Sequence, residues 1–268
     1  MRAYNNGGVI HYKFNILEPF HEIRHFVTGR IGGFSNDPFS SMNIGFGTDD
    51  NSDTVLKNRK TFCESLGIPL DWFIFPQQTH SANIAIVNHT NIGSGAFIRE
   101  DAIADTDALI TNCKNICIVV QVADCVPILL LDSKNSVIAA VHAGWKGSLN
   151  GILGLTIKKM IETFNTEPVN IIAAIGPSIG PCCYEIGEEL KKMFIENNSK
   201  NSEFFIKYSN HEHLDLWKAN KNQLLQSGVN GNNIEIAEIC TKCHHNKFFS
   251  SRANNGITGR FAAGIMLQ

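Results

Sequence analysis

Two apolar, β-branched segments separated by a short polar stretch restrict the fold of this chain more than any other feature. They cover residues 126–131 and 137–141, and the DSKNS between them has the composition of a turn. The pattern predicts a buried β-hairpin. A hairpin brings its outer ends together, so Cys125, directly before the first strand, and His142, directly after the second, should be neighbours in space.

The remaining periodic segments predict more strands than helices, and they mix strand–strand neighbours with strand–helix–strand units. This order favours an α+β fold in which mixed β-sheets pack with helices in a layered sandwich. No segment has the composition of a linker, so we expect one domain over residues 1–268. The glycine- and serine-rich residues 28–50 predict a structured loop. Expected helices cover 54–66, 149–164 (with Ser148 as N-cap), 187–196 and 214–227, and the other expected strands cover 72–75, 84–87, 107–111, 116–122, 169–175, 234–239, 248–250 and 261–266.

Charge and hydropathy exclude several classes of partner. The net charge is −2 and no basic stripe is present, so we expect neither nucleic acid nor a membrane surface as partner. No apolar stretch approaches the roughly 20 residues that cross a bilayer, and the N-terminus lacks the apolar core of a secretory signal. We therefore expect a cytoplasmic protein with reduced cysteines. The sequence leaves the oligomeric state open between monomer and dimer.

Three strand ends carry a side chain that can bind a metal. His80 lies in FPQQTHS, Cys125 in VADCVP and His142 in VHAGWKG. Two histidines and a cysteine suit Zn²⁺, and three protein ligands leave a fourth position open, as in catalytic sites. The alternative is that both histidines are ordinary strand-end residues and that Cys125 is a small core side chain. Asp124 is either a carboxylate that orients a ligand or acts as a base, or a turn residue.

The same residues can also be interpreted without a metal. Cys125 would then be a nucleophile and His142 its base, as in cysteine hydrolases. The chemical objection is that a thiolate that binds zinc is a poor free nucleophile.

A second cysteine motif lies near the C-terminus. Cys240 and Cys243 form a C-x₂-C pair that resembles half of a structural zinc site. A second pair at matching spacing is missing, because Cys182-Cys183 and the C-x₃-C at residues 113–117 match poorly. We therefore expect Cys240 to be a buried thiol at a strand end.

Two further segments suggest contacts with a ligand. The glycine- and proline-rich GPSIGPCCYEIG at residues 176–187 would keep backbone close to a ligand or partner, and it lacks both common nucleotide-binding glycine patterns. Arginines can grip phosphate or carboxylate with two parallel hydrogen bonds. The candidates are Arg30, Arg59, Arg252 and Arg260.

Five motifs in this order resemble the bacterial YfiH-type family, which is labelled laccase-domain, polyphenol oxidase, peptidoglycan-editing factor or purine nucleoside phosphorylase. They are QQTHS, ADCVPILL, VHAGWKG, AIGPSIGPCCYEIG and FFSSRANNGITGR, and the likeness extends from VTGRIGGFS to TGRFAAGIML. The sequence departs from the family pattern at Gly29, where serine or threonine is usual, and at Ser251, where histidine is usual. The second departure puts a role for Ser251 in doubt, whereas Arg252 matches.

The resemblance implies a YfiH/CNF1-like layered fold and zinc on His80, Cys125 and His142. It also implies phosphorolysis of adenosine, inosine, guanosine and methylthioadenosine, with adenosine deamination as a companion activity. A bound metal that acidifies water would serve deamination, and positioned cations would hold phosphate. The small-molecule partners would be purine nucleosides and phosphate. The expected catalytic residues are Asp124, Cys125 and His142, and the expected substrate or phosphate contacts are Asn43, Arg59, Lys146 and Arg252.

The laccase label conflicts with the histidine pattern. A multicopper oxidase needs several His-x-His pairs, and this chain has one, at residues 211–213. Copper could still occupy the His/Cys/His site as an adventitious substitute, because Cu²⁺ outbinds Zn²⁺ at most sites. Two other functions stay open: a cysteine hydrolase or amidase that edits peptidoglycan precursors with a Cys125–His142 dyad, and a metal- or partner-binding protein without catalysis.

Overall fold

The computed structural model describes residues 1–208 and 210–268, which form three β-sheets and five α-helices. The helices are α1 (Ser52–Leu66), α2 (Trp145–Leu149), α3 (Ile152–Phe164), α4 (Glu188–Asn197) and α5 (Leu216–Gln226). The strands are β1 (Arg2–Asn6), β2 (Val9–Lys13), β3 (Ile23–Thr28), β4 (Phe73–Ile74), β5 (Ile84–Ile86), β6 (Ala108–Thr111), β7 (Cys117–Val122), β8 (Val126–Asp132), β9 (Val137–Ala143), β10 (Ile171–Ile175), β11 (Glu185–Ile186), β12 (Phe205–Tyr208), β13 (His211–Leu214), β14 (Ile234–Ile236) and β15 (Phe261–Leu267).

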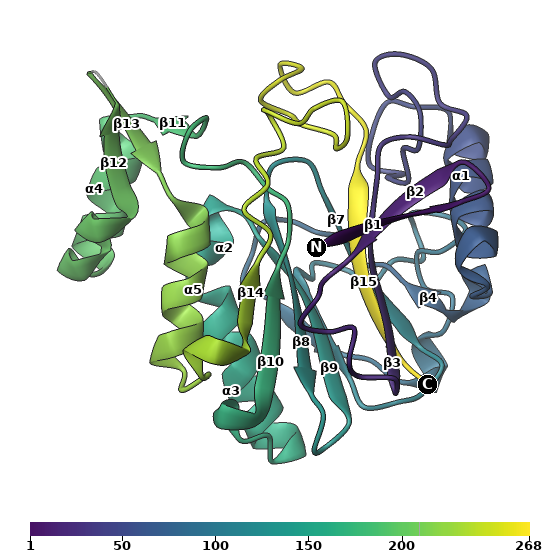
Figure 1. Cartoon of the computed structure of the whole chain (residues 1–268), viewed down its shortest axis with the longest axis horizontal. Coiled ribbons are helices and arrows are strands. Elements are labelled where there is room, and N and C mark those ends of the chain that lie inside the picture. Colours follow the sequence, from purple (N-terminus) through teal and green to yellow (C-terminus); the bar gives the residue numbers. More distant parts are fainter. Residues whose placement is uncertain (209) are drawn as a thin grey trace.

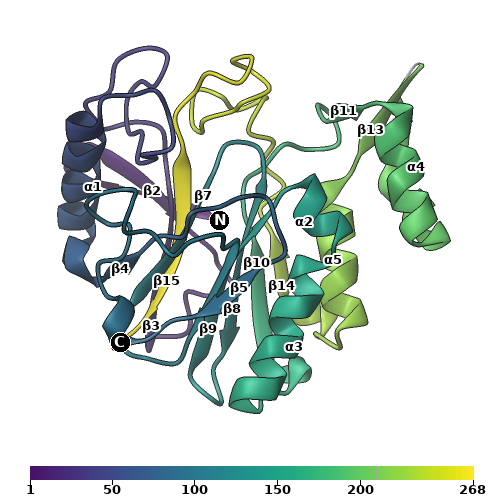
Figure 2. The ribbon, with the colours of Figure 1, turned by 180° about the vertical axis from the view of Figure 1, so that it is seen from behind.

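Two six-stranded mixed sheets form the centre of the molecule. The first has the order β1-β2-β3-β15-β7-β4, and the second has the order β14-β10-β8-β9-β6-β5. The edge pairs β4–β7, β5–β6 and β10–β14 are parallel, whereas the inner neighbours are antiparallel. A small third sheet, β11-β13-β12, lies with α4 beyond α5, away from the two large sheets (Figures 1 and 2). The predicted α+β class with mixed sheets is confirmed.

The sheets and helices stack in four layers (Figure 1). Helix α1 covers the outer face of the first sheet, where Phe62 packs with Phe26 and Phe73. Helices α3 and α5 cover the outer face of the second sheet. The faces between the two sheets are apolar and fully buried, with Ile118 of β7 and Ile265 of β15 in the same core as Leu129 of β8.

The central hairpin explains why its sequence is an almost continuous apolar run. Because successive side chains of a strand point to opposite faces, a strand with helices on one side and a sheet on the other must be apolar throughout. In β8, Val126, Ile128 and Leu130 pack in the core beneath the helices. Leu129 and Leu131 alternate with them and pack against the first sheet. The predicted hairpin is confirmed as β8 and β9.

Two predictions need correction. The helix expected over 149–164 is present as α3 but begins only at Ile152, because Gly151 adopts a left-handed φ of 73° and separates it from the short α2. Ser148 therefore lies inside α2 instead of capping a helix, and its Oγ accepts a hydrogen bond from Asn220. Residues 248–250 form no strand, since Phe248 and Phe249 instead bury their rings in the core between the sheets.

Strands β1–β3 and β11–β13 were not anticipated, because polar residues and short lengths hide their alternation. Among the described residues, no helix combines the length and apolar character needed to cross a membrane.

Candidate functional site

A cavity of about 610 Å³ opens where strands of both large sheets end. Its walls include the segments after β4 and β7, the end of β9, and the loops that follow β10 and precede β15. Small-molecule sites usually have volumes of roughly 300–1,000 Å³ and lie at such sheet ends. The cavity is therefore large enough for a ligand of nucleoside size.

His80, Cys125 and His142 meet at one side of this cavity. Their candidate ligand atoms all lie within 4.8 Å of one another, and the two imidazole rings are 5.0 Å apart at 72°. The hairpin register pairs Val126 with Ala143, which brings the ends of β8 and β9 together as expected. His80 comes from the loop after β4 and completes the group from the other sheet.

The buried carboxylate of Asp107 organises two of these three side chains. Its Oδ1 lies 2.7 Å from Nδ1 of His142 and accepts the backbone N–H of His80 at 3.1 Å. Its Oδ2 accepts the backbone N–H and the hydroxyl of Ser81, each at 2.7 Å. A carboxylate that binds Nδ1 fixes the ring and leaves Nε2 free to face a metal. Asp107 thus holds the position of the orienting carboxylate, a role that the sequence suggested for Asp124.

Electrostatics within the group favour an ionised thiol. Burial alone would raise the pKa of Cys125, but His142 and His80 outweigh it and lower this pKa to about 6. Burial alone would lower the pKa of His142, but Cys125 and Asp107 raise it to about 9. Hydrogen bonds from His142 and Ser81 hold the pKa of Asp107 below its usual range despite burial. The charges within the group therefore favour the thiolate form of Cys125 and the protonated form of His142.

Cys125 and His80 pack so closely against Gly144 that a side chain at this position would collide with them. A Cβ at this position would lie 2.9 Å from Sγ of Cys125 and 3.2 Å from Cδ2 of His80. His80 itself has a φ of 61°, which is uncommon for a residue with a side chain. The hydrogen bond from its backbone N–H to Asp107 stabilises this conformation. The positions of Cys125 and His80 are therefore closely constrained by their neighbours, as the fixed ligand distances of a metal site require.

Asp124 lines the cavity, but its carboxylate bonds to neighbouring loops. Oδ1 accepts the hydroxyl of Thr241 at 2.6 Å, and Oδ2 accepts the backbone N–H of Arg252 at 2.6 Å. The backbone C=O of Asp124 also accepts the N–H of Ile179. Asp124 therefore ties the segments around residues 179, 241 and 252 to the strand end that carries Cys125.

The four expected substrate contacts divide into two groups. Arg59 and Arg252 line the cavity. Asn43 does not line it, since its amide is used within the loop, where it accepts the backbone N–H groups of Gly45 and Arg260. Lys146 lies exposed on α2 with its Nζ over the ring of Trp145, and it is also absent from the cavity lining.

Positive charge dominates the lining of the cavity. Arg59, Arg99, Arg252 and Arg260 all contribute to it, and the one acidic residue in the lining is Asp124. Among the described residues, none of these four arginines forms an ion pair. Unpaired guanidinium groups that converge on a cavity suit an anionic ligand.

Arg59 is the most constrained of these cations. It is buried, and its guanidinium lies 4.1 Å from the ring of Phe46 and 3.9 Å from the ring of Phe75. Its Nε donates to the C=O of Ile44 at 2.8 Å, and its Nη1 donates to the C=O of Ala96 at 2.9 Å. Burial lowers its pKa to about 9. The group is thus a fixed positive charge at the cavity wall.

Asp107, Arg99 and Tyr184 were not among the site residues expected from the sequence. Asp107 directly precedes a buried strand, so the rule that selected the other strand-end residues could have selected it as well. Arg99 and Tyr184 lie on loops whose positions in the sequence carry no periodic signal.

The chain is similar to known proteins over almost its full length. Residues 24–268 match the family model described as "Multi-copper polyphenol oxidoreductase laccase". A purine nucleoside phosphorylase of Bacteroides thetaiotaomicron is 34% identical over 257 residues, which is 95% of each chain. The adenosine deaminase RL5 of an unknown prokaryotic organism is 33% identical over 93% of each chain. The crystal structure of YlmD from Geobacillus stearothermophilus superposes with a TM-score of 0.91 at 31% identity, covering 99% of this chain and 98% of YlmD.

Proposed function

Because this chain belongs to the YfiH-type laccase-like family, whose relatives process nucleosides, we propose that it is a zinc-dependent purine nucleoside phosphorylase with adenosine deaminase activity. Its substrates would be adenosine, inosine, guanosine and methylthioadenosine. The resemblance seen in the sequence is confirmed at the level of the family. The reaction and the substrates are our proposal for this chain.

One observation carries the proposal: a group of side chains that could bind a metal and four arginines without an ion pair line the same cavity. Phosphorolysis needs an inorganic phosphate beside the ribose of a bound nucleoside. Arginines bind phosphate oxygens in pairs of hydrogen bonds, and a cavity with a single acid, already bonded to two donors, does not repel the anion. The net charge of −2 makes this local positive charge a specific feature of the site.

The donor set fits zinc. A sulfur and two imidazole nitrogens are ligands that Zn²⁺ binds tetrahedrally with one position left open. The histidines at 211 and 213 cannot complete a copper cluster here, since they lie on β13 with their Nδ1 atoms bonded to Glu185 and to the C=O of Pro181. The cavity thus contains two histidines, His80 and His142, far fewer than a multicopper centre uses.

The roles of the chain's own residues follow from charge. In phosphorolysis, a phosphate oxygen bonds to C1′ of the ribose as the bond from C1′ to the purine nitrogen breaks, which gives ribose 1-phosphate and free base. Positive charge develops on the ribose and negative charge on the base. Arg59 and Arg252 would hold and orient the phosphate, and Asp107 would keep His142 fixed. A zinc ion, when bound, would supply Lewis acidity at this side of the cavity.

The test is the release of hypoxanthine from inosine, measured with and without phosphate. The proposal expects release that depends on phosphate and yields equimolar ribose 1-phosphate. Release of free ribose without phosphate would contradict phosphorolysis. Deamination is followed separately as inosine and ammonia formed from adenosine.

A matched pair of variants assigns the activity to the site. Cys125→Ala removes a proposed ligand and should abolish turnover. Cys113→Ala alters a cysteine that does not line the cavity and should leave turnover unchanged. If Cys125→Ala retained both bound metal and turnover, the site assignment would fail.

A cysteine hydrolase that edits peptidoglycan precursors is the competing proposal, because the Cys125 thiolate next to His142 is also the chemistry of a nucleophile and base. Metal content separates the two. Protein purified without added metal should contain stoichiometric zinc if Cys125 is a ligand. Zinc far below one per chain, together with inactivation by a thiol-directed reagent, would favour the hydrolase.

A further inference from the structure

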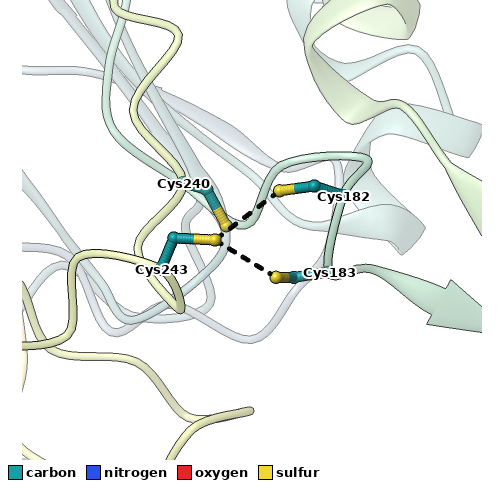
Figure 3. A group of neighbouring side chains, drawn as sticks. All are labelled: Cys182, Cys183, Cys240 and Cys243. Carbon is teal, nitrogen blue, oxygen red and sulfur yellow. Dashed lines mark hydrogen bonds between the residues drawn. The ribbon is translucent and has the colours of Figure 1, made fainter.

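Four cysteines from two distant segments converge outside the catalytic cavity (Figure 3). Cys182 and Cys183 lie in the loop before β11, and Cys240 and Cys243 lie in the segment after β14. Their four sulfur atoms all lie within 4.8 Å of one another. The spacing along the chain gave no reason to pair them, since adjacent cysteines match a C-x₂-C motif poorly. The turn at residues 181–183 allows both sulfurs of the adjacent pair to face the other two.

The sulfur separations have the size that a tetrahedral zinc site imposes. Zinc–sulfur bonds are about 2.3 Å, so two sulfurs of a tetrahedron are about 3.8 Å apart. Sγ of Cys243 lies 3.8 Å from Sγ of Cys182 and 3.4 Å from Sγ of Cys183 (Figure 3). A disulfide needs about 2.05 Å, and all four cysteines are free. In a [4Fe–4S] cluster each cysteine binds a different iron, and in a [2Fe–2S] cluster the four cysteines are divided between two irons. Sulfurs on different irons lie further apart than the four sulfurs do here.

Backbone hydrogen bonds fix both segments around the sulfurs. The N–H of Ser178 donates to the C=O of Ile239, and the N–H of Thr241 donates back to the C=O of Ser178. The N–H of Cys183 donates to the C=O of Gly180, and the N–H of His244 donates to the C=O of Cys240. The two turns therefore hold each pair of cysteines in place.

Four convergent sulfurs suit a divalent cation. Cysteine binds a metal as the thiolate, and one divalent ion can bind all four sulfurs in that form.

We propose that Cys182, Cys183, Cys240 and Cys243 bind a second zinc ion, as a closed structural site. Four protein ligands leave no position for substrate, which distinguishes it from the three-ligand group in the cavity.

The position of this site gives it a defined structural role. The cysteine-bearing segments continue into the cavity wall through Ile179 and Tyr184, and Thr241 bonds to Asp124. The backbone N–H of Arg252 bonds to the same carboxylate. The zinc would thus clamp the two loops that place Tyr184 and Arg252 at the cavity.

The experiment measures metal in a chain from which the cavity ligand has been removed. Cys125→Ala is produced in zinc-supplemented medium, purified under reducing conditions and analysed by mass spectrometry for metals. We expect one zinc per chain, and X-ray absorption should show four sulfur neighbours at about 2.3 Å. Because Cys125 is absent, this result does not depend on the proposed catalytic function.

Two double variants complete the test. In Cys125→Ala/Cys243→Ser the zinc bound per chain should fall by at least about tenfold, since the serine hydroxyl does not ionise to replace a thiolate. Cys125→Ala/Cys113→Ser is the matched control and should keep it. A zinc-free Cys125→Ala chain, iron in place of zinc, nitrogen or oxygen neighbours in the absorption spectrum, or an intact mass showing a disulfide would each overturn the proposal. The spectrum of Cys125→Ala decides the matter even where the Cys243 variant fails to fold.

Discussion

Gly144→Ala should weaken zinc binding without unfolding the protein. Gly144 has φ −73° and ψ 178°, which alanine adopts without strain, so the whole effect comes from the added Cβ. That atom would lie 2.9 Å from Sγ of Cys125, whereas unstrained contacts begin at about 3.5 Å. The sulfur, the imidazole of His80 at 3.2 Å, or the backbone must therefore move by a total of about 0.6 Å.

This displacement exceeds what a metal site tolerates. Ligand distances in metal sites are held to about 0.2 Å, so a shift three times larger should cost at least tenfold in zinc affinity, or about 1.4 kcal/mol. Competition with a chromophoric chelator measures the affinity, and thermal unfolding reports whether the fold is retained. We expect hypoxanthine release to fall in step with zinc occupancy.

Gly154→Ala supplies the matched control. Gly154 lies within α3, and its added Cβ would meet Oγ of Ser227 at an ordinary 3.6 Å. Alanine at a helical glycine should raise stability by about 0.4–1 kcal/mol and leave zinc affinity unchanged. If Gly144→Ala bound zinc as tightly as the wild type, the packing of Cys125 and His80 around this glycine would not define the site.

Three further predictions follow from single contacts. Asp107→Asn replaces an acceptor-only carboxylate that holds His142, so zinc affinity should fall by about 10- to 100-fold in the same chelator competition. In zinc-free protein, the lowered pKa of Cys125 should move the midpoint of its alkylation by iodoacetamide to about pH 6, from about 8.5 for a free thiol. A midpoint near 8.5 would contradict the thiolate–imidazolium pair. The stability that this ionised thiol contributes is present above its unfolded pKa and is lost as the pH falls through about 6. Arg252→Met should raise KM for phosphate by about tenfold with KM for inosine little changed, whereas Arg2→Met, at an exposed arginine that does not line the cavity, should change neither.

Periodicity revealed the parts of the fold that are buried on both sides. The hairpin β8–β9 and the strands β7 and β15 were predicted nearly to their ends, because both of their faces are apolar. The edge strand β1 was missed because its residues, RAYNN, are largely exposed. The break at Gly151 was also missed, since glycine in a helical pattern does not by itself reveal a left-handed conformation.

The meeting of Cys125 and His142 was predictable for a topological reason, whereas the positions of the arginines were less so. Strand ends are readable in a sequence, and a hairpin forces its two ends together, so Cys125 and His142 could be paired without a structure. Whether Arg59 or Lys146 faces the cavity depends on the rotation of a helix relative to a loop, which no sequence spacing specifies. The four-cysteine group was not predictable for a different reason: the bridge between Ser178 and Cys240 joins segments about 60 residues apart.

Asp124→Asn separates a base from a positioning residue. Asp124 has a φ of 91°, which asparagine tolerates, so the backbone should be retained. The single carbonyl oxygen of asparagine can accept only one of the two donors that Asp124 binds now, the hydroxyl of Thr241 and the N–H of Arg252, and it lacks the charge that strengthens both bonds. If Asp124 positions this loop, KM for phosphate should rise severalfold while the pH dependence of kcat keeps its shape, and Asp124→Glu should not restore it. If Asp124 were the base, kcat itself would fall by at least about 100-fold and its acidic limb would disappear, which would refute the positioning role.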